Sequence, residues 1–238
     1  GIFTVINGDV TFDLNGYSVT YTGHSETFCN KIVEALFYAN NGAKLTIVDS
    51  SAEKTGSVEV YGMATAVYST GVGSVATVKG GTWNGYGCPE CGAFNIFLYA
   101  SHGGELYIED GYFSQNGLED SGLGSILIVE HSGAVKNLDA LVDYAQTKIE
   151  ITGGTVYAFN AGNSGHSSAP GDIYNFISGT AEQHPTFLSP FHGTTSTVTS
   201  DEVVNVIKGY PVFQNKAGEK LSIYGGCKNG TVENVTTY

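Results

Sequence analysis

The feature that most constrains this chain is a repeat of about 30 residues. Tyr38, Tyr68 and Tyr99 lie 30 and 31 residues apart, and Val129 follows after another 30. Each of the four comes directly after an apolar residue and a few residues before a glycine. A pattern that returns at an interval of this length is typical of solenoids, in which one supersecondary unit stacks on the next. We therefore expect one coil per repeat.

The repeats are predicted to consist of short β-strands. Apolar residues alternate with polar ones, whereas the coils of a helical solenoid would repeat them every three or four positions. The second strand of each coil is marked by the pairs Leu45/Ile47, Ala76/Val78 and Leu106/Ile108, with Phe12/Leu14 as an earlier copy and Ile149/Ile151 as a later one. The third strand is predicted to begin at Gly81, Gly111 and Gly154 and to end at the turn pairs Asn84-Gly85, Asn116-Gly117 and Ala161-Gly162. Glycine suits such corners because it tolerates positive φ.

The glycine corners resemble those of a known superfamily. Gly80-Gly81-Thr82-Trp83, Gly153-Gly154-Thr155-Val156 and the opening Val10 to Gly16 are similar to the right-handed parallel β-helix repeat proteins. These include pectin and pectate lyases, polygalacturonases, phage tailspikes and bacterial surface adhesins. The resemblance covers roughly residues 8–165. It implies an all-β, right-handed parallel β-helix over residues 1–165, and because this fold hosts enzymes, spikes and adhesins alike it does not fix a function.

Residues 166–238 are predicted to be a C-terminal cap or a continuation of the coils. The period fades in a stretch rich in Gly and Ser, residues 160–172, and three of the five prolines follow it. An open solenoid end exposes unpaired strand edges, so a covering module is expected there. Within it, residues 200–208 suit a short helix or a further strand.

Composition excludes two classes of partner. The formal net charge is −13, and all ten basic residues are lysine. An acidic chain without arginine has no basic stripe for a phosphate backbone, so no nucleic acid is expected to bind. No stretch approaches the roughly 20 apolar residues of a membrane helix, so no membrane insertion is expected.

The enzymes of the resembled superfamily imply catalytic groups that are missing here. Its lyases commonly use arginine or lysine as a base beside calcium, and its hydrolases use three clustered aspartates with Gly-His-Gly and Arg-x-Lys segments. The nearest fragments are isolated: Gly23-His24, Gly165-His166 and His192-Gly193. No catalytic residue is predicted, and a polysaccharide lyase or glycoside hydrolase of this fold is the alternative.

Two acidic positions in the repeat are predicted to form cross-coil charge pairs on a solvated face. These are Glu105 with Lys148 and Glu109 with Lys79, which the proposed register places side by side. Glu119 and Asp120 lie in a loop and are the candidate contacts for a sugar or for calcium. No other cofactor and no metal site is predicted.

The tyrosine column has two interpretations. Tyr38, Tyr68 and Tyr99 could form an exposed ladder on which sugar rings lie, or a structural ladder that stabilises the coils, and the structural interpretation is favoured. Trp83 and Phe113 share an apolar column with Val156 and are expected in the core. Tyr112 is then predicted to point outward beside Thr82 and Thr155, as a candidate ligand contact.

The cysteine spacing favours a local disulfide between Cys88 and Cys91. Metal binding by this pair is the second choice, because zinc needs four ligands and no second Cys-x-x-Cys follows. Cys29 is two coils away, an offset of roughly 9.6 Å that exceeds the reach of a disulfide. An oxidised pair would indicate an extracellular setting.

Together these features predict a non-enzymatic surface module, extracellular or on a virion, that is structural or adhesive and contacts glycans or cell-surface components. A homotrimeric fibre or spike subunit is the other non-enzymatic alternative.

Overall fold

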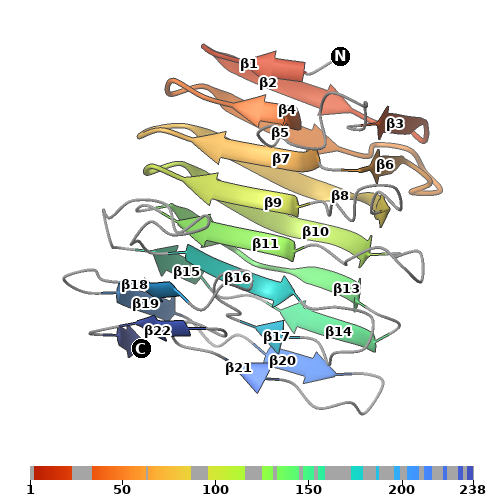
Figure 1. Cartoon of the computed structure of the whole chain (residues 1–238). Coiled ribbons are helices and arrows are strands. Elements are labelled where there is room, and N and C mark those ends of the chain that lie inside the picture. The colour runs from red at the N-terminus through yellow and green to blue at the C-terminus, as the bar shows by residue number, and fades with distance from the viewer. Residues whose placement is uncertain are drawn as a thin grey trace.

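The computed structural model describes residues 3–22, 34–62, 64–86, 96–115, 125–130, 133–144, 147–152 and 155–158, together with short strands beyond residue 172. The regular secondary structure within these ranges consists of β-strands alone. The strands stack into a solenoid whose N-terminus lies at one end (Figure 1). This confirms the predicted all-β parallel solenoid, while membership of the pectin-lyase-like superfamily stays a prediction.

Each coil contributes strands to three faces. The first face contains β1 (Phe3–Val5), β4 (Glu34–Ala39), β7 (Ala64–Thr70), β9 (Ile96–Ser101) and β11 (Ser125–Glu130). The second contains β2 (Asp9–Asp13), β5 (Lys44–Val48), the first halves of β8 (Val75–Tyr86) and β10 (Glu105–Gln115), and β12 (Ala134–Lys136). The third contains β3 (Ser18–Thr22), β6 (Ser57–Tyr61), the second halves of β8 and β10, and β13 (Ala140–Tyr144).

The strands of the first four coils pair in parallel with their counterparts in the next coil. On the first face Phe3, Phe37, Val67 and Leu98 share one register position. In the third coil the chain turns from the second face to the third inside β8, at Gly80 and Gly81, whose φ angles are +118° and +89°. Such angles are accessible to glycine at low cost, which explains the glycine pair at this corner.

The inward-facing side chains form one continuous core. Phe37 is 1% exposed, and Trp83 and Phe113 are fully buried. Their rings meet across coils, with centroids 6.1 Å apart for Phe37 and Trp83 and 5.8 Å apart for Trp83 and Phe113. Fully burying a side chain of this kind contributes about 1.5 to 3 kcal/mol, so the stacked core is a main source of stability.

The structure corrects the earliest copy of the repeat. Val10 and Phe12, rather than Phe12 and Leu14, pair with Leu45 and Ile47. Leu14 comes just after the strand and is 2% exposed at the corner. The alternating pattern could not distinguish these two alignments of the first coil with the second. They differ by a shift of two residues, and such a shift leaves the same side chains facing inward.

The last parallel coil also differs from the prediction. Ile128, not Val129, pairs with Tyr99, and Val135, rather than Ile149, pairs with Leu106. The predicted pair Ile149/Ile151 lies in β14 (Thr147–Thr152), which runs antiparallel to β13. β12 has only three residues, Ala134–Lys136, and this run is too short to show an alternating pattern.

One predicted strand end and one predicted column position are wrong as well. Asn84 and Gly85 lie inside β8, where they pair with Glu59 and Val60, and do not form a turn. Val156 lies in β15 (Thr155–Ala158), which is antiparallel to β12, so it shares no column with Trp83. Asn-Gly is common in turns but does not require one, and here the Gly sits on the inward side of the strand opposite a buried valine.

Beyond β15 the structure describes strands only. They are β16 (Ile173–Ser178), β17 (Thr186–Phe187), β18 (Ser196–Val198), β19 (Val203–Lys208), β20 (Val212–Asn215), β21 (Ser222–Ile223), β22 (Gly230–Val232) and β23 (Val235–Thr237). β19 shows that residues 203–208 form a strand, the second of the two alternatives for this segment. The boundary at residue 165 and the capping role of residues 166–238 stay predictions.

Candidate functional site

The tyrosine column forms a stacked ladder on the outside of the first face. The ring centroids of Tyr38 and Tyr68 are 5.1 Å apart, and those of Tyr68 and Tyr99 are 4.4 Å apart at an interplanar angle of 8°. Tyr99 is 7% exposed, and the other two are partly buried. Burial, and then the neighbouring Tyr68, raises the pKa of the Tyr38 hydroxyl. The three rings thus cover one another's faces along the ladder.

A hydroxyl network fixes the lower part of this ladder. The Ser101 Oγ lies 2.8 Å from the Tyr68 hydroxyl, 3.0 Å from the Thr70 hydroxyl and 2.9 Å from the His102 Nδ1. A serine beside a histidine is the arrangement used in nucleophilic catalysis. Ser101 is fully buried, however, so a substrate has no access to its oxygen. The network therefore holds the ladder in place.

A second aromatic stack lies on the third face and was missed at the sequence level. The rings of Tyr61 and Tyr86 are 4.5 Å apart and inclined by 11°, and the Tyr61 hydroxyl donates to the Glu59 Oε2 at 3.3 Å. Burial, followed by the negative charge of Glu59, raises the pKa of both tyrosines. Their spacing is 25 residues rather than 30, because the corner at residues 49–56 is longer than the corresponding one in β8. The sequence does carry a signal for this stack, because the two alternating segments 57–61 and 82–86 both end in a tyrosine.

Charged side chains on the second face are paired between coils. Lys79 Nζ lies 3.1 Å from Glu109 Oε2, as the register predicted. Glu105 pairs with Lys136 at 2.6 Å and not with Lys148, which lies in antiparallel β14. The hydrogen bond to Glu105 raises the pKa of the Lys136 ammonium. Partly exposed pairs of this kind contribute about 0.2 to 1 kcal/mol each, which is a modest structural role.

Two aspartates fasten the corner between the second and third faces of the first two coils. Asp49 is 2% exposed, and its carboxylate accepts backbone N–H bonds from Gly16 at 2.9 Å, Ser51 at 3.2 Å and Gly56 at 2.7 Å. Burial acts to raise the pKa of this carboxyl, but the hydrogen bonds from Ser51, Gly56 and Gly16 outweigh it and hold the pKa below 3.8. Asp13 accepts bonds from the Ser50 side chain and backbone, which lower its pKa as well. These carboxylates are therefore structural acceptors.

The remaining predicted site residues are placed only in part. Tyr112 is partly buried and pairs in register with Thr82, as expected, while Thr155 lies in β15 and pairs with Lys208 instead. Glu119, Asp120, Cys88 and Cys91 lie outside the described residues. Within the described part of the chain, no group of three His, Cys, Asp or Glu side chains is arranged to hold a metal ion.

Comparison with known proteins finds no matching family model, no matching curated protein and no matching solved structure. Among the residues that the structure describes, there is no helix with the length and apolar character to span a membrane.

Proposed function

We propose that this chain is a rigid, non-enzymatic β-solenoid module of an extracellular or virion surface, which contacts glycans through tyrosines on its outer faces. One observation carries the proposal: both tyrosine stacks end at the second coil. The first-coil residues above Tyr38 and Tyr61 are the exposed threonines Thr4 and Thr22. Within the described residues, each of these two rings stacks on one tyrosine only.

An aromatic ring that stacks on a neighbouring ring through one face only can offer its other face to a sugar. A tyrosine offers a flat apolar body and a polar hydroxyl, which match the apolar face and hydroxyl groups of a pyranose. Thr22 and Glu59 supply hydrogen-bonding groups beside Tyr61. The net charge of −13 and the absence of arginine favour a neutral glycan over a polyuronate, because an anionic sugar would be repelled.

Rigidity is the second part of the proposal. Ladders of stacked rings and cross-coil charge pairs hold outward side chains at fixed positions, so a binding partner would meet a preformed surface. The setting outside a cell is carried over from the tailspikes and adhesins that the sequence resembles.

A glycan array tests the proposal, followed by titration of any neutral glycan that binds. Tyr61→Ala and Tyr38→Ala are expected to weaken binding at least tenfold, since each removes a stacking surface. Tyr17→Ala is the matched control, because Tyr17 is 73% exposed and belongs to neither stack. Incubation of the bound polysaccharide should release no reducing ends or unsaturated products. Glycan cleavage, or binding unaffected by both ladder variants, would overturn the proposal.

A further inference from the structure

Tyr68 combines a ring stacked on both faces with a hydrogen-bonded hydroxyl. Its ring lies between those of Tyr38 and Tyr99, with centroids 5.1 and 4.4 Å away, and its hydroxyl lies 2.8 Å from the Ser101 Oγ. The face of an aromatic ring carries the negative end of its quadrupole and attracts positive charge. The two neighbouring rings would therefore stabilise the middle ring if it lost an electron.

The hydroxyl of Tyr68 begins a path that leads to the surface. Ser101 is fully buried, and its Oγ lies 2.9 Å from the Nδ1 of His102, whose side chain is exposed. A serine hydroxyl can accept one hydrogen bond while it donates another. When His102 is neutral and carries its proton on Nε2, Tyr68 can donate to Ser101 and Ser101 to Nδ1. Two hydrogen bonds then join the phenol to an imidazole, the side chain best suited to take up a proton near neutral pH.

Such a path matters for the oxidation of a phenol. A phenol that loses an electron but keeps its proton becomes a cation, and a cation is costly to hold away from water. Tyr68 is only partly exposed, so a positioned proton acceptor makes the loss of an electron easier. The product is then a neutral phenoxyl radical.

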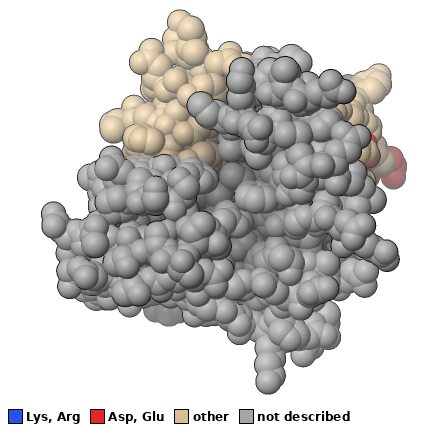
Figure 2. Space-filling view, in the orientation of Figure 1, with Lys and Arg blue, Asp and Glu red and all other residues tan. Residues whose placement is uncertain are grey.

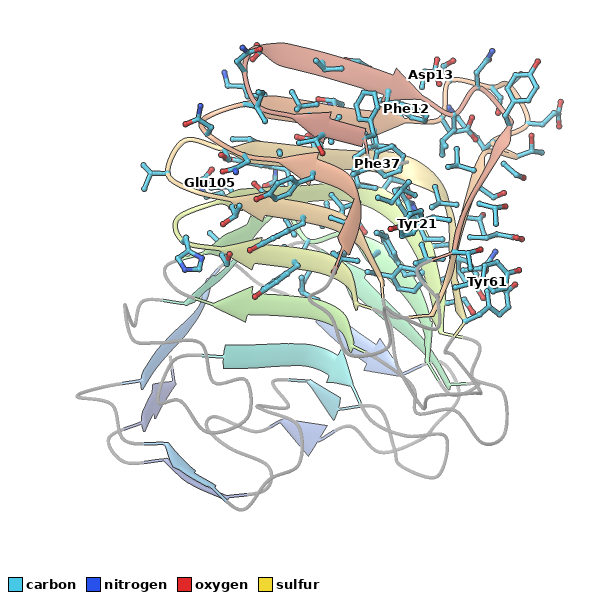
Figure 3. The ribbon with its side chains drawn as sticks, turned by 45° about the horizontal axis from the view of Figure 1, so that its top comes forward. Phe12, Asp13, Tyr21, Phe37, Tyr61 and Glu105 are labelled. Carbon is cyan, nitrogen blue, oxygen red and sulfur yellow. The ribbon has the colours of Figure 1, made fainter. Side chains whose placement is uncertain are left out.

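Two other stacked tyrosines lack one of these features. Tyr38 belongs to the same ladder, but its hydroxyl has no hydrogen-bond partner among the described residues. Tyr61 donates to Glu59 across a longer distance, 3.3 Å, and stacks on one tyrosine only within the described coils. Figure 3 shows Tyr61 at the opposite edge of the coils from Glu105, which closely follows the relay along the chain. The Tyr61 stack is therefore separate from this path.

We propose that Tyr68 is a one-electron oxidation site, at which a small oxidising radical withdraws an electron while the phenolic proton leaves through Ser101 to His102. The O–H bond of Tyr68 breaks and its proton passes to the Ser101 Oγ, as the proton of Ser101 passes to Nδ1 of His102. With the azidyl radical as oxidant, the products are an azide anion, a phenoxyl radical and an imidazolium cation. This site is independent of glycan binding, which uses ring faces at the other end of the ladder.

The charge of the protein decides which oxidant is a suitable probe. The formal net charge is −13, and acidic side chains are visible at the edge of the described surface in Figure 2. An anionic oxidant would be repelled by this surface. The azidyl radical, produced by pulse radiolysis of an azide solution, is uncharged and has no such bias.

Electron paramagnetic resonance of samples frozen after the pulse measures the radical. The azidyl radical oxidises exposed tyrosines as well, but their phenoxyl radicals are consumed by coupling between molecules. The signal that survives should belong to Tyr68, so Tyr68→Phe should remove it. Tyr17→Phe should leave it unchanged, because Tyr17 is 73% exposed and belongs to neither stack.

Two variants of the relay separate proton transfer from folding. Ser101→Ala removes the bridging hydroxyl. His102→Asn suits the φ of +51° at this position and offers Ser101 an amide oxygen, which accepts a hydrogen bond but does not take the proton. Each variant should lower the surviving signal by about tenfold or more, since a positioned proton acceptor typically contributes at least that much. His102→Asn should retain the Tm of the wild type.

Three results would overturn the proposal. The first is the absence of a surviving phenoxyl signal in the wild type. The second is an unchanged signal in Tyr68→Phe, which would place the radical on another residue. The third is an unchanged signal in His102→Asn at the wild-type Tm, which would show that His102 does not receive the proton.

Discussion

At the residue scale, the polar groups buried in this solenoid divide into satisfied and unsatisfied ones. Asp49 receives N–H bonds from both sides of its corner. Thr65 Oγ1 and Ser69 Oγ, on the buried side of β7, have no hydrogen-bond partner. A buried polar group without a hydrogen-bond partner lowers the stability of the fold, whereas a carboxylate that accepts several backbone N–H bonds raises it. The two kinds of residue should therefore respond to substitution in opposite directions.

Removing the unpartnered hydroxyls should stabilise the protein. Thr65→Val and Ser69→Ala are each expected to raise the free energy of unfolding by about 1 kcal/mol, because each removes a desolvated hydroxyl. Urea unfolding measures the change. Thr70→Val is the matched control on the same strand: its hydroxyl bonds Ser101 at 3.0 Å, so its loss should cost about 1 kcal/mol. Destabilisation by the first two variants would show that their hydroxyls are hydrogen-bonded.

Asp49 should make stability depend on acid pH. Its pKa in the folded protein lies below 3.8, so the ionised form favours folding above about pH 4, and this contribution is lost as the pH falls through the folded pKa. Asp49→Asn should lower the Tm at neutral pH and flatten the fall of the Tm below about pH 4. Thermal unfolding from pH 7 to pH 2 tests this, with the exposed Asp139→Asn as control. Parallel curves for wild type and Asp49→Asn would contradict the role given to this carboxylate.

Gly56 should tolerate no side chain. A Cβ there would lie 2.6 Å from Asp49 Cγ and 2.7 Å from Leu14 Cβ. Gly56→Ala is expected to cost about 3 kcal/mol, since both neighbours are buried and have little room to move. Gly8→Ala, where a Cβ would meet no atom within 4 Å, should cost only about 1 kcal/mol from its positive φ. Chemical denaturation of both variants measures the difference, and equal costs would contradict the close packing at this corner.

At the element scale, the strands are held in register by columns of like side chains. Tyr68 stacks on Tyr38 above and Tyr99 below, whereas Tyr38 stacks only on Tyr68 within the described coils. Tyr68 should therefore contribute more to stability than Tyr38, because its ring takes part in two stacking contacts.

Substitution within the ladder should reveal this difference. Tyr68→Ala should destabilise the protein by about 1 kcal/mol more than Tyr38→Ala, because one additional ring pair is lost. Tyr68→Phe retains both stacks and should lose only the hydroxyl contact with Ser101, about 1 kcal/mol. Equilibrium unfolding in urea gives all three values. Equal losses for the two alanine variants would contradict a ladder that extends in both directions from Tyr68.

Sequence reasoning succeeded for elements whose spacing was regular. The 30-residue interval placed Tyr38, Tyr68 and Tyr99 in one column, and alternation placed the preceding apolar residues inside. It failed where a corner changed length. The longer corner at residues 49–56 brought Tyr61 beside Tyr86 at a separation of 25, which a fixed period cannot show.

At the scale of the whole molecule, prediction was accurate where coils repeat and failed where parallel stacking ends. From β14 and β15 onward most described pairings are antiparallel, so the expected column positions of Lys148, Ile149 and Val156 were wrong. Antiparallel strands show the same alternation as parallel ones, and only tertiary contacts distinguish the two. The contacts of Asp49 likewise depend on a corner whose geometry alternation does not specify.

The central claim is that residues about 30 positions apart lie side by side in parallel strands, and backbone nuclear Overhauser effects test it most directly. In a protonated, selectively labelled sample, contacts are predicted between Leu45 and Ala76, between Thr77 and Tyr107, and between Thr82 and Tyr112. Parallel strands give amide-to-Hα contacts between such partners without short Hα-to-Hα contacts. Strong Hα-to-Hα contacts between neighbouring strands of residues 3–136, or partners shifted from these positions, would contradict the parallel solenoid.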